Sequence, residues 1–357
     1  MTRLVLLPGL GVTARLFEPQ RRAFPSLEVP EWLAPERGET LPSYGRRMAG
    51  ALGPVGGDLV LGGISFGGMV ALEMARHLPA RAVALVASAA TGAALTGAAH
   101  ALARAARGLP KAALAPPRPV WPVVAWAFGA KTPAERALVH DLIRTARPGF
   151  AKWGLGAING WRPAGAPPCP VRALHGADDR LISARKVSAE RLVRGAGHLV
   201  NVTHADEVNA FLRSVIESPS IRESAAGDRE RVRAFYLACG HRALLAAEDR
   251  VLVAEREGEI IGAVRFCVEE GVQVLRTMRV RTDAQRRGVG RALLQRFATL
   301  LEGGPCYCLP FAHLAGFYGE IGFREVAPED LPPHLARRLA QYRAEKPRVD
   351  MIAMRRP

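Results

Sequence analysis

Short apolar runs alternate with helical patterns through the first 217 residues. The runs are rich in Val, Leu and Ala and have the length of buried strands, while the segments that follow them carry apolar residues at helical spacing. Strands that alternate with helices predict a parallel sheet covered by helices, which is an α/β fold. The predicted strands are 4–7, 58–61, 81–87 and 171–175, and the clearest helices are 69–77 and 208–216.

A long insertion at residues 90–168 interrupts this alternation. It has helical patterns near 98–107 and 133–146 and holds four of the five tryptophans. In a strand–helix chain, such an insertion is expected to be a helical lid that shapes an apolar pocket. The alternative is an ordinary helical subdomain whose tryptophans only pack.

The pattern changes again after residue 217. Ser, Pro, Ala and Gly gather at 218–227, which predicts a domain boundary there. Two strands joined by a Glu-Gly turn, and a strand–loop–helix after them, predict a second domain of the α+β class at 218–357. Its predicted helices are 229–247 and 291–301, and its strands are 221–222, 250–255, 259–268, 273–281 and 306–309.

Composition places the chain among globular proteins. Its 357 residues are 49% hydrophobic and 23% charged, and the formal net charge is +16. Basic residues are in excess in both domains rather than in a tail. We therefore expect anionic small molecules as partners, and no nucleic acid, since no nucleic-acid motif accompanies the charge.

Five cysteines without a Cys-x-x-Cys pair predict neither disulfides nor a metal site, and favour a reducing, cytoplasmic location. The apolar N-terminus is broken at Pro8 and Gly9, which favours a strand over a signal peptide. Residues 82–103 are uncharged but weakly apolar, so we expect no membrane span.

A catalytic motif lies between the predicted strand 58–61 and the helix 69–77. Gly63-Ile64-Ser65-Phe66-Gly67 matches Gly-x-Ser-x-Gly, the nucleophile elbow. A sharp strand-to-helix turn needs residues without side chains beside the serine. It also sets the Ser65 hydroxyl above a helix N-terminus, where developing negative charge is stabilised.

The loop after the first strand has two interpretations. In the first, which we favour, Leu10 gives its backbone N–H to an oxyanion hole whose second donor is the N–H of Phe66. In the second, residues 9–14 form a Gly-x-Gly-x-x-Ala dinucleotide fingerprint, with Glu28 or Glu31 as the ribose-binding acid.

An acid and a histidine follow the serine in chain order. Asp178 and Asp179 come just after the strand 171–175, and His198 stands in a Gly-Ala-Gly-His loop before the last helix. With Ser65, these blocks make residues 1–217 resemble the α/β-hydrolases. The resemblance implies that Ser65 is the nucleophile, His198 the general base and Asp179 the acid that orients it.

The chain departs from that family in two ways. It begins at the strand before the oxyanion loop, so we expect the first strands of the family to be absent. The interval from Asp179 to His198 is short, which predicts a shortened helix. We expect His175 to pack at its strand end and His204 to lie near the start of the last helix.

The strand–loop–helix at 273–301 contains an anion-binding loop. Its glycines let a phosphate approach backbone N–H groups at a helix start, and its arginines add positive charge. The spacing matches neither a Rossmann fingerprint nor a Walker loop. The alternative is a basic helix start with a turn. The loop consists of Gln285, Arg286, Arg287, Gly288, Val289, Gly290 and Arg291.

A second motif, Phe317-Tyr318-Gly319-Glu320-Ile321-Gly322-Phe323, follows downstream. Together with Gln-x-x-Gly-x-Gly at 285–290, it makes residues 219–357 resemble the GNAT acetyltransferases. The resemblance implies that loop 285–291 binds the pyrophosphate of acetyl-CoA, and that the strand near Val280 holds its pantetheine and acetyl group. It also implies that Tyr318 protonates the leaving thiolate; a packed helix aromatic is the alternative.

Many members of that family have a Glu as base on the strand before the loop. Here that strand carries Arg276, Thr277 and Arg279, so the sequence names no general base, and a water molecule would serve. We expect His313 to pack or cap. No metal is expected in either domain.

The sequence thus predicts an α/β-hydrolase domain at 1–217 with a lid at about 90–168, fused to a GNAT domain at 218–357. The expected function is bifunctional: a serine hydrolase for an ester, thioester or amide, and an acetyl-CoA-dependent N-acetyltransferase for a small amine. One hypothesis is that the hydrolase unmasks the amine that the transferase caps. The alternative is that only one half is catalytic and the other binds or regulates.

Overall fold

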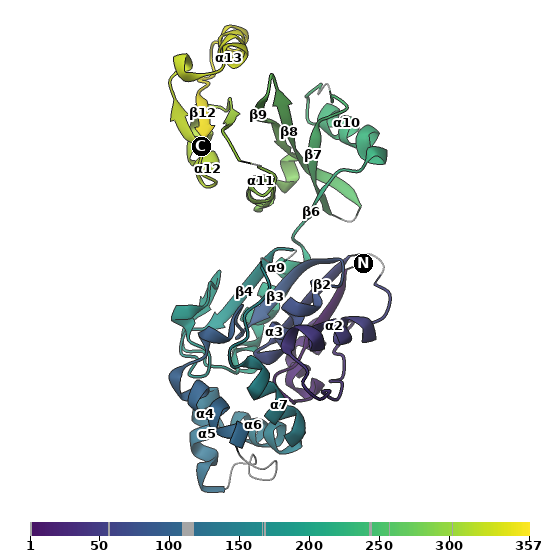
Figure 1. Cartoon of the computed structure of the whole chain (residues 1–357), viewed down its shortest axis with the longest axis vertical. Helices are drawn as coiled ribbons and strands as arrows, with labels where there is room; N and C mark the ends of the chain where they lie inside the picture. Colours follow the sequence, from purple (N-terminus) through teal and green to yellow (C-terminus); the bar gives the residue numbers. More distant parts are fainter. Residues whose placement is uncertain are drawn as a thin grey trace. The chain divides into compact units, whose positions relative to one another are not determined.

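The computed structural model describes residues 2–55, 58–108, 118–165, 167, 169–242, 245–256, 258–301 and 303–357. The chain forms two compact units, Met1–Glu217 and Ser218–Pro357. Each unit has its own sheet (Figure 1). Each also has its own hydrophobic core.

The first unit is built on a parallel sheet of five strands in the order β1-β2-β3-β4-β5. A single parallel bridge from Val5 to Glu28 extends it beyond β1. Because all strands point the same way, the loops at their carboxyl ends gather at one edge, where a site can form. The strands are β1 Arg3–Leu7, β2 Leu59–Ile64, β3 Ala80–Val86, β4 Val171–Gly176 and β5 Arg191–Val193.

Helices cover both faces of this sheet, which confirms the predicted α/β class. Strand residues alternate between the two cores: Val5 packs with α2 and α3, whereas Leu4 and Leu6 pack with α9. The covering helices are α1 Glu18–Ala23, α2 Leu41–Ala51, α3 Phe66–Met74, α8 Val200–Thr203 and α9 Ala205–Ile216.

In its described residues, the insertion forms four α-helices. They lie together beyond the sheet (Figure 1). They are α4 Gly97–Gly108, α5 Trp121–Phe128, α6 Pro133–Thr145 and α7 Pro148–Ile158. Two indole groups of the insertion form hydrogen bonds with the rest of the unit. Trp153 Nε1 donates to the Glu39 carbonyl oxygen at 2.9 Å, and Trp161 Nε1 donates to the buried carboxylate of Glu73 at 2.7 Å.

In place of the shortened helix expected between Asp179 and His198, the chain forms a 3-10 turn, Ala184–Lys186, and then β5. The connection from β4 to β5 is thus too short for a crossover helix. β5 is the edge strand of the sheet and has only three residues.

The second unit has a seven-stranded sheet in the order β11-β12-β10-β9-β8-β7-β6. Only β9 and β10 are parallel neighbours, and they pair at just two positions, so they separate toward their carboxyl ends. The strands are β6 Ser220–Glu223, β7 Arg250–Arg256, β8 Glu259–Glu269, β9 Val272–Val280, β10 Cys306–Cys308, β11 Arg324–Val326 and β12 Ala353–Arg356.

Helices lie on both sides of this sheet too. One core joins the sheet to α11 and α12, and two further cores join it to α10 and α13. The helices are α10 Arg229–Ala238, α11 Val289–Ala298, α12 Ala315–Gly319 and α13 Pro333–Glu345. The prediction that the first helix reaches residue 247 is wrong. It ends at Ala238 because Gly240 turns the chain with φ 70°.

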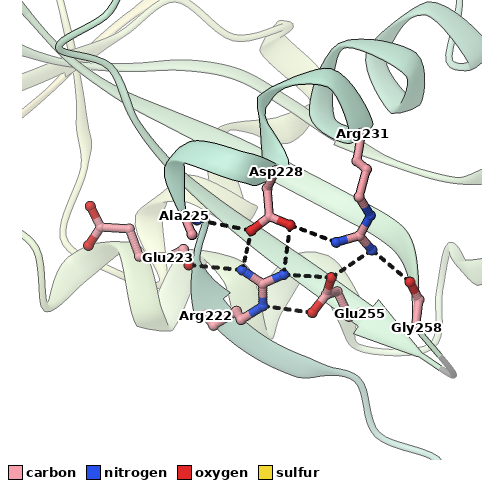
Figure 2. A network of polar contacts seen from close by, with 7 residues as sticks. All are labelled: Arg222, Glu223, Ala225, Asp228, Arg231, Glu255 and Gly258. Atoms are coloured by element: carbon pink, nitrogen blue, oxygen red, sulfur yellow. Dashed lines mark hydrogen bonds and ion pairs between the residues drawn. The ribbon is translucent and has the colours of Figure 1, made fainter.

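A network of ion pairs fastens the first strand of this unit (Figure 2). Arg222 on β6 reaches Asp228 at 2.5 Å and Glu255 on β7 at 2.7 Å. Arg231 on α10 contacts the same two carboxylates at 2.6 and 3.0 Å. The forked geometry of each guanidinium connects β6, β7 and α10 at the point where the unit begins.

Candidate active sites

Ser65 lies in a strained turn between β2 and α3. Its backbone has φ 54° and ψ −121°, which is rare for a residue with a side chain. A Cβ at Gly67 would come within 2.1 Å of the Leu7 carbonyl oxygen, and one at Gly63 within 2.4 Å of the Gly67 carbonyl carbon. Both glycines are therefore required for the turn that presents the Ser65 side chain.

Asp179 and His198 are bonded to each other at the carboxyl end of the sheet. His198 Nδ1 lies 2.8 Å from Asp179 Oδ2, and because a carboxylate only accepts, Nδ1 carries the proton and Nε2 keeps a lone pair in the neutral ring. The other carboxylate oxygen accepts from the N–H groups of Leu181 and Ile182 at 2.8 and 3.0 Å. Asp178, the other acid considered, is exposed.

Burial opposes the charge on Asp179, but its partners overcome this. Attraction to His198 and hydrogen bonds from His175, His198 and the Ile182 N–H hold the pKa of this carboxyl well below its usual range. His175 Nε2 lies 3.3 Å from Asp179 Oδ2 and 3.0 Å from the Ile182 carbonyl oxygen, so it donates between them. His175, which was expected only to pack, thus supports the acid.

Ser65 and His198 line the same cavity, which has a volume of about 250 Å³. Within the described part of the chain, the hydroxyl and the imidazole do not form a hydrogen bond, a looseness that is common before substrate binds. Leu10 and Phe66, the proposed oxyanion donors, also line it. The N–H of Phe66 is the first of α3 and so lacks an acceptor within the helix.

The dinucleotide interpretation of residues 9–14 is wrong. A fingerprint would open a long helix, whereas the loop continues into a four-residue 3-10 turn, Ala14–Phe17. Of the two proposed ribose ligands, Glu28 is held by Arg3 at 2.7 Å, whereas Glu31 lines a hollow together with residues 11–14. The missing long helix is therefore what excludes the fingerprint.

Apart from Ser65 and His198, the described residues around this cavity are apolar or glycine. The tryptophans of the insertion do not line this cavity. Trp126, for example, is 58% exposed, and its ring stacks against the Arg180 guanidinium. Smaller side chains of the insertion do line it. They are Leu95, Ala99, Ala103, Phe128, Val139, Leu142, Ile143, Ala146, Ala151, Leu155 and Ile158.

The end of α5 also supports the loop that carries His198. The Leu199 N–H donates to the Phe128 carbonyl oxygen at 3.1 Å, and the Phe128 ring meets the His198 ring edge-on at 5.6 Å between centroids. Gly129 and Gly197 pack so closely that a Cβ on the first would lie 2.8 Å from the Cα of the second. The insertion thus both walls the cavity and fixes the imidazole.

In the second unit, loop 285–291 leads into α11 with the expected open backbone. Gly288 precedes the helix at φ 81°, and a Cβ there would meet nothing within 4 Å. Arg286 and Arg287 are exposed, and Gln285 Nε2 donates to the Val280 carbonyl oxygen at 3.0 Å. Arg291, expected to face a phosphate, instead pairs with Glu320 at 2.6 Å. Val289 is buried in the core.

Tyr318 on α12 lines a second pocket of about 280 Å³, which we call the Tyr318 pocket. Its hydroxyl lies 4.0 Å from Met278 Sδ on β9. Burial raises the pKa of Tyr318 well above its usual range, so the phenol keeps its proton. The other lining residues are His241, Leu275, Thr277, Met278, Arg279, Cys308, Leu309, Pro310, Phe311, Leu314, Tyr342, Glu345, Lys346 and Met351.

His241 is a site residue that the sequence analysis missed. It follows α10 and lines the Tyr318 pocket, with its ring 6.1 Å from that of Tyr236. Burial, and then the positive charges of Arg279, Arg265, Lys346 and Arg276, lower the pKa of His241 below its usual 6.5. The ring is therefore neutral at neutral pH. No motif marks this histidine, because only the fold brings it to the pocket.

Two other histidines that the sequence singled out have structural positions. His204 directly precedes α9 and its Nδ1 lies 2.8 Å from Thr203 Oγ1, whereas His313 stacks on Phe311 at 5.7 Å. Among the described residues, no cluster of His, Cys, Asp or Glu could hold a metal ion. No described helix is both long and apolar enough to cross a membrane.

Comparison with known proteins separates the same two regions. The family profile "Alpha/beta hydrolase family" matches residues 4–211, more than half of the chain, and "Acetyltransferase (GNAT) domain" matches residues 247–325. No curated protein matches the chain.

Solved structures that resemble the chain include an esterase from Thermogutta terrifontis, with 20% identity over 60% of this chain and 89% of that one at a TM-score of 0.47. The RedJ thioesterase of prodiginine biosynthesis in Streptomyces coelicolor has 22% identity over 59% and 89%, with a TM-score of 0.42. A bromoperoxidase from Bacillus anthracis has 17% identity over 60% and 91%, with a TM-score of 0.45.

Proposed function

The chain belongs to the α/β hydrolase family and carries a GNAT acetyltransferase domain behind the hydrolase domain, and from this premise we propose that it is a bifunctional enzyme. The first unit hydrolyses esters or thioesters of apolar acyl groups with a serine nucleophile. The second unit transfers acetyl from acetyl-CoA to a small amine. The observation that carries the proposal is the shared cavity of Ser65 and His198, with Asp179 bonded behind the imidazole.

For hydrolysis, Ser65 Oγ attacks the acyl carbonyl carbon while His198 Nε2 takes its proton. Asp179 keeps the His198 tautomer and stabilises the imidazolium, which its lowered pKa supports. The N–H groups of Leu10 and Phe66 stabilise the oxyanion. His198 then protonates the leaving group, and water repeats the sequence on the acyl-enzyme.

The lining of the cavity supports an apolar acyl substrate. A charged or strongly polar acyl chain would lose its hydration without gaining partners, since the described wall offers apolar side chains beyond Ser65 and His198. Burial of each methylene is worth about 0.8 kcal/mol, so the substrate preference should follow chain length until the cavity is full.

In the second unit, acetyl-CoA would supply a thioester as the acyl donor. The open backbone at Gly288 and the exposed Arg286 and Arg287 suit its pyrophosphate. Because β9 and β10 separate, backbone N–H and C=O groups near Val280 have no partner on β10 and can bind the pantetheine. Tyr318, which keeps its proton, can protonate the thiolate that leaves.

The missing base of the transferase has a candidate in His241. It lines the Tyr318 pocket and is neutral at neutral pH, so it can take a proton from the attacking amine.

We also propose a reducing, cytoplasmic environment, because all five cysteines are free.

A fluorophosphonate probe tests the hydrolase directly. We expect it to label the full chain at Ser65, to fail on Ser65→Ala, and to label Ser43→Ala normally, because Ser43 serves only in the cap of α2. Labelling of Ser65→Ala at the wild-type rate would remove the proposed nucleophile. For the second unit, acetyl-CoA should raise the melting temperature of the full chain. Without that rise, the second unit would be the non-catalytic half.

A further inference from the structure

Arg279 on β9 lines the Tyr318 pocket without a protein partner. Its Nε is buried without a hydrogen bond, and no ion pair reaches its guanidinium from any residue that the structure describes. Neighbouring arginines differ. Arg276 pairs with Glu269 at 2.6 Å and reaches the Tyr342 hydroxyl at 3.3 Å, and Arg281 pairs with Glu259 at 2.7 Å.

Two acidic residues of this unit pair with other arginines: Glu269 is shared by Arg276 and Arg338, and Asp249 is held by Arg265. Glu345, which lines the same pocket, is exposed and accepts from Gln341 Nε2 at 2.8 Å. Among the described residues, no ion pair joins Glu345 to Arg279. Arg279 is half-buried, and its Nε is buried without a hydrogen bond. A buried donor without a partner costs free energy, and a bound anion would remove that cost.

We propose that the acceptor amine carries a carboxylate, which Arg279 receives, so that the second unit acetylates amino acids or similar anionic amines. This rests on the acetyl transfer proposed for the same pocket. A planar guanidinium with unused donors matches one carboxylate in a forked pair. Arg279, His241 and Tyr318 line the same pocket of about 280 Å³, so the carboxylate and the reacting amine fall within one small molecule.

The reaction then balances without a further reactant. The amine nitrogen forms a bond to the acetyl carbon and the carbon–sulfur bond breaks. The surplus proton of the nitrogen passes to His241, and the thiolate takes a proton from Tyr318. Arg279 takes part in none of these transfers and acts as a binding residue.

The test measures binding to the full chain saturated with CoA. The ligands are N-acetyl derivatives of glycine, leucine and phenylalanine, each as the free carboxylate and as the uncharged amide, and the readout is calorimetric affinity. We expect the carboxylate of at least one pair to bind about tenfold to a hundredfold more tightly than its amide. Arg279→Met should remove this preference, while Arg279→Lys should keep part of it.

The matched control is Arg276→Met, which removes a guanidinium from the same strand but outside the pocket lining; its preference should match the wild type. Equal affinity for every carboxylate and amide, or a preference that survives Arg279→Met, would overturn the inference. So would weaker CoA binding by Arg279→Met, because it would assign Arg279 to the donor. If CoA itself fails to bind the wild type, the proposed acetyl transfer is what fails.

Discussion

The cavity of the first unit and the Tyr318 pocket of the second are completed in different ways. Beside the cavity, the buried carboxylate of Asp179 has four partners: His198, His175 and two backbone N–H groups. In the pocket, Arg279 lacks a partner and His241 is surrounded by positive charge. The acid–histidine pair of the first site is arranged before substrate arrives, whereas the second site needs its ligands to balance its polar groups.

This difference separates catalytic groups from binding groups. Satisfied polar groups around Asp179 fix an orientation, which is what a general base requires. An unsatisfied group such as Arg279 is available to a ligand. We therefore expect substitutions in the cavity to lower kcat, and substitutions at Arg279 to act on acceptor affinity.

The largest effect should come from Asp179→Asn. An amide at this position would stabilise the wrong tautomer of His198, so kcat for a p-nitrophenyl ester should fall on the order of 10⁴-fold. Asp178→Asn, at the exposed neighbour, should retain the wild-type rate. A comparable loss in both variants would mean that neither acid has the proposed role.

A smaller loss is expected for Tyr318→Phe. Without the phenol, the departing thiolate has no buried proton donor, so acetyl transfer should fall about 10²-fold while acetyl-CoA binding stays the same. Tyr307→Phe is the control, because Tyr307 is buried on β10 outside the pocket lining. Stopped-flow measurement of CoA release separates the chemical step from binding. An unchanged rate of acetyl transfer would indicate that Tyr318 only packs.

Narrowing the cavity should have a selective effect. The larger side chain in Ile143→Trp would occupy part of the cavity. We expect about a tenfold loss of kcat/KM for long-chain esters, with short-chain esters less affected. Leu192→Trp introduces the same indole at a side chain that is 52% exposed and should leave the chain-length profile unchanged. A profile that does not change in Ile143→Trp would show that the acyl chain binds elsewhere.

The pH profile of acetyl transfer should show the smallest but most diagnostic effect. Since the pKa of His241 is lowered from 6.5, the imidazole is a free base above that pH and becomes protonated only below it. The acid limb of kcat/KM, calculated on the concentration of unprotonated amine, should therefore lie below pH 6.5 and disappear in His241→Gln. An acid limb above pH 6.5, or one that persists in His241→Gln, would exclude His241 as the base.

The parts of this molecule that local sequence dictates were predictable. The turn at Ser65 needs Gly63 and Gly67 for steric reasons, and the open start of α11 needs Gly288, so both left a readable motif. Strands β2, β3 and β4 were predictable because each is a short apolar run.

The features that depend on distant contacts could not be predicted. His241 reaches the Tyr318 pocket because α10 ends early, and Arg279 has no hydrogen-bond or ion-pair partner among the described residues, which no local pattern indicates. Strands β11 and β12 are too short to have a clear alternation, and α13 carries no chemical motif. The contact of His175 with Asp179 also depends on the fold, so the sequence alone did not indicate that His175 is a second partner of this acid.

The central claim is that one chain holds two catalytic sites that work by separate residues. The most direct measurement is the rate of both reactions, ester hydrolysis and acetyl transfer, in the full-length variants Ser65→Ala and Tyr318→Phe. We predict that Ser65→Ala loses hydrolysis alone and that Tyr318→Phe loses acetyl transfer alone. If either substitution abolished both reactions in a folded chain, or neither reaction responded to its own substitution, the account of two sites would be contradicted.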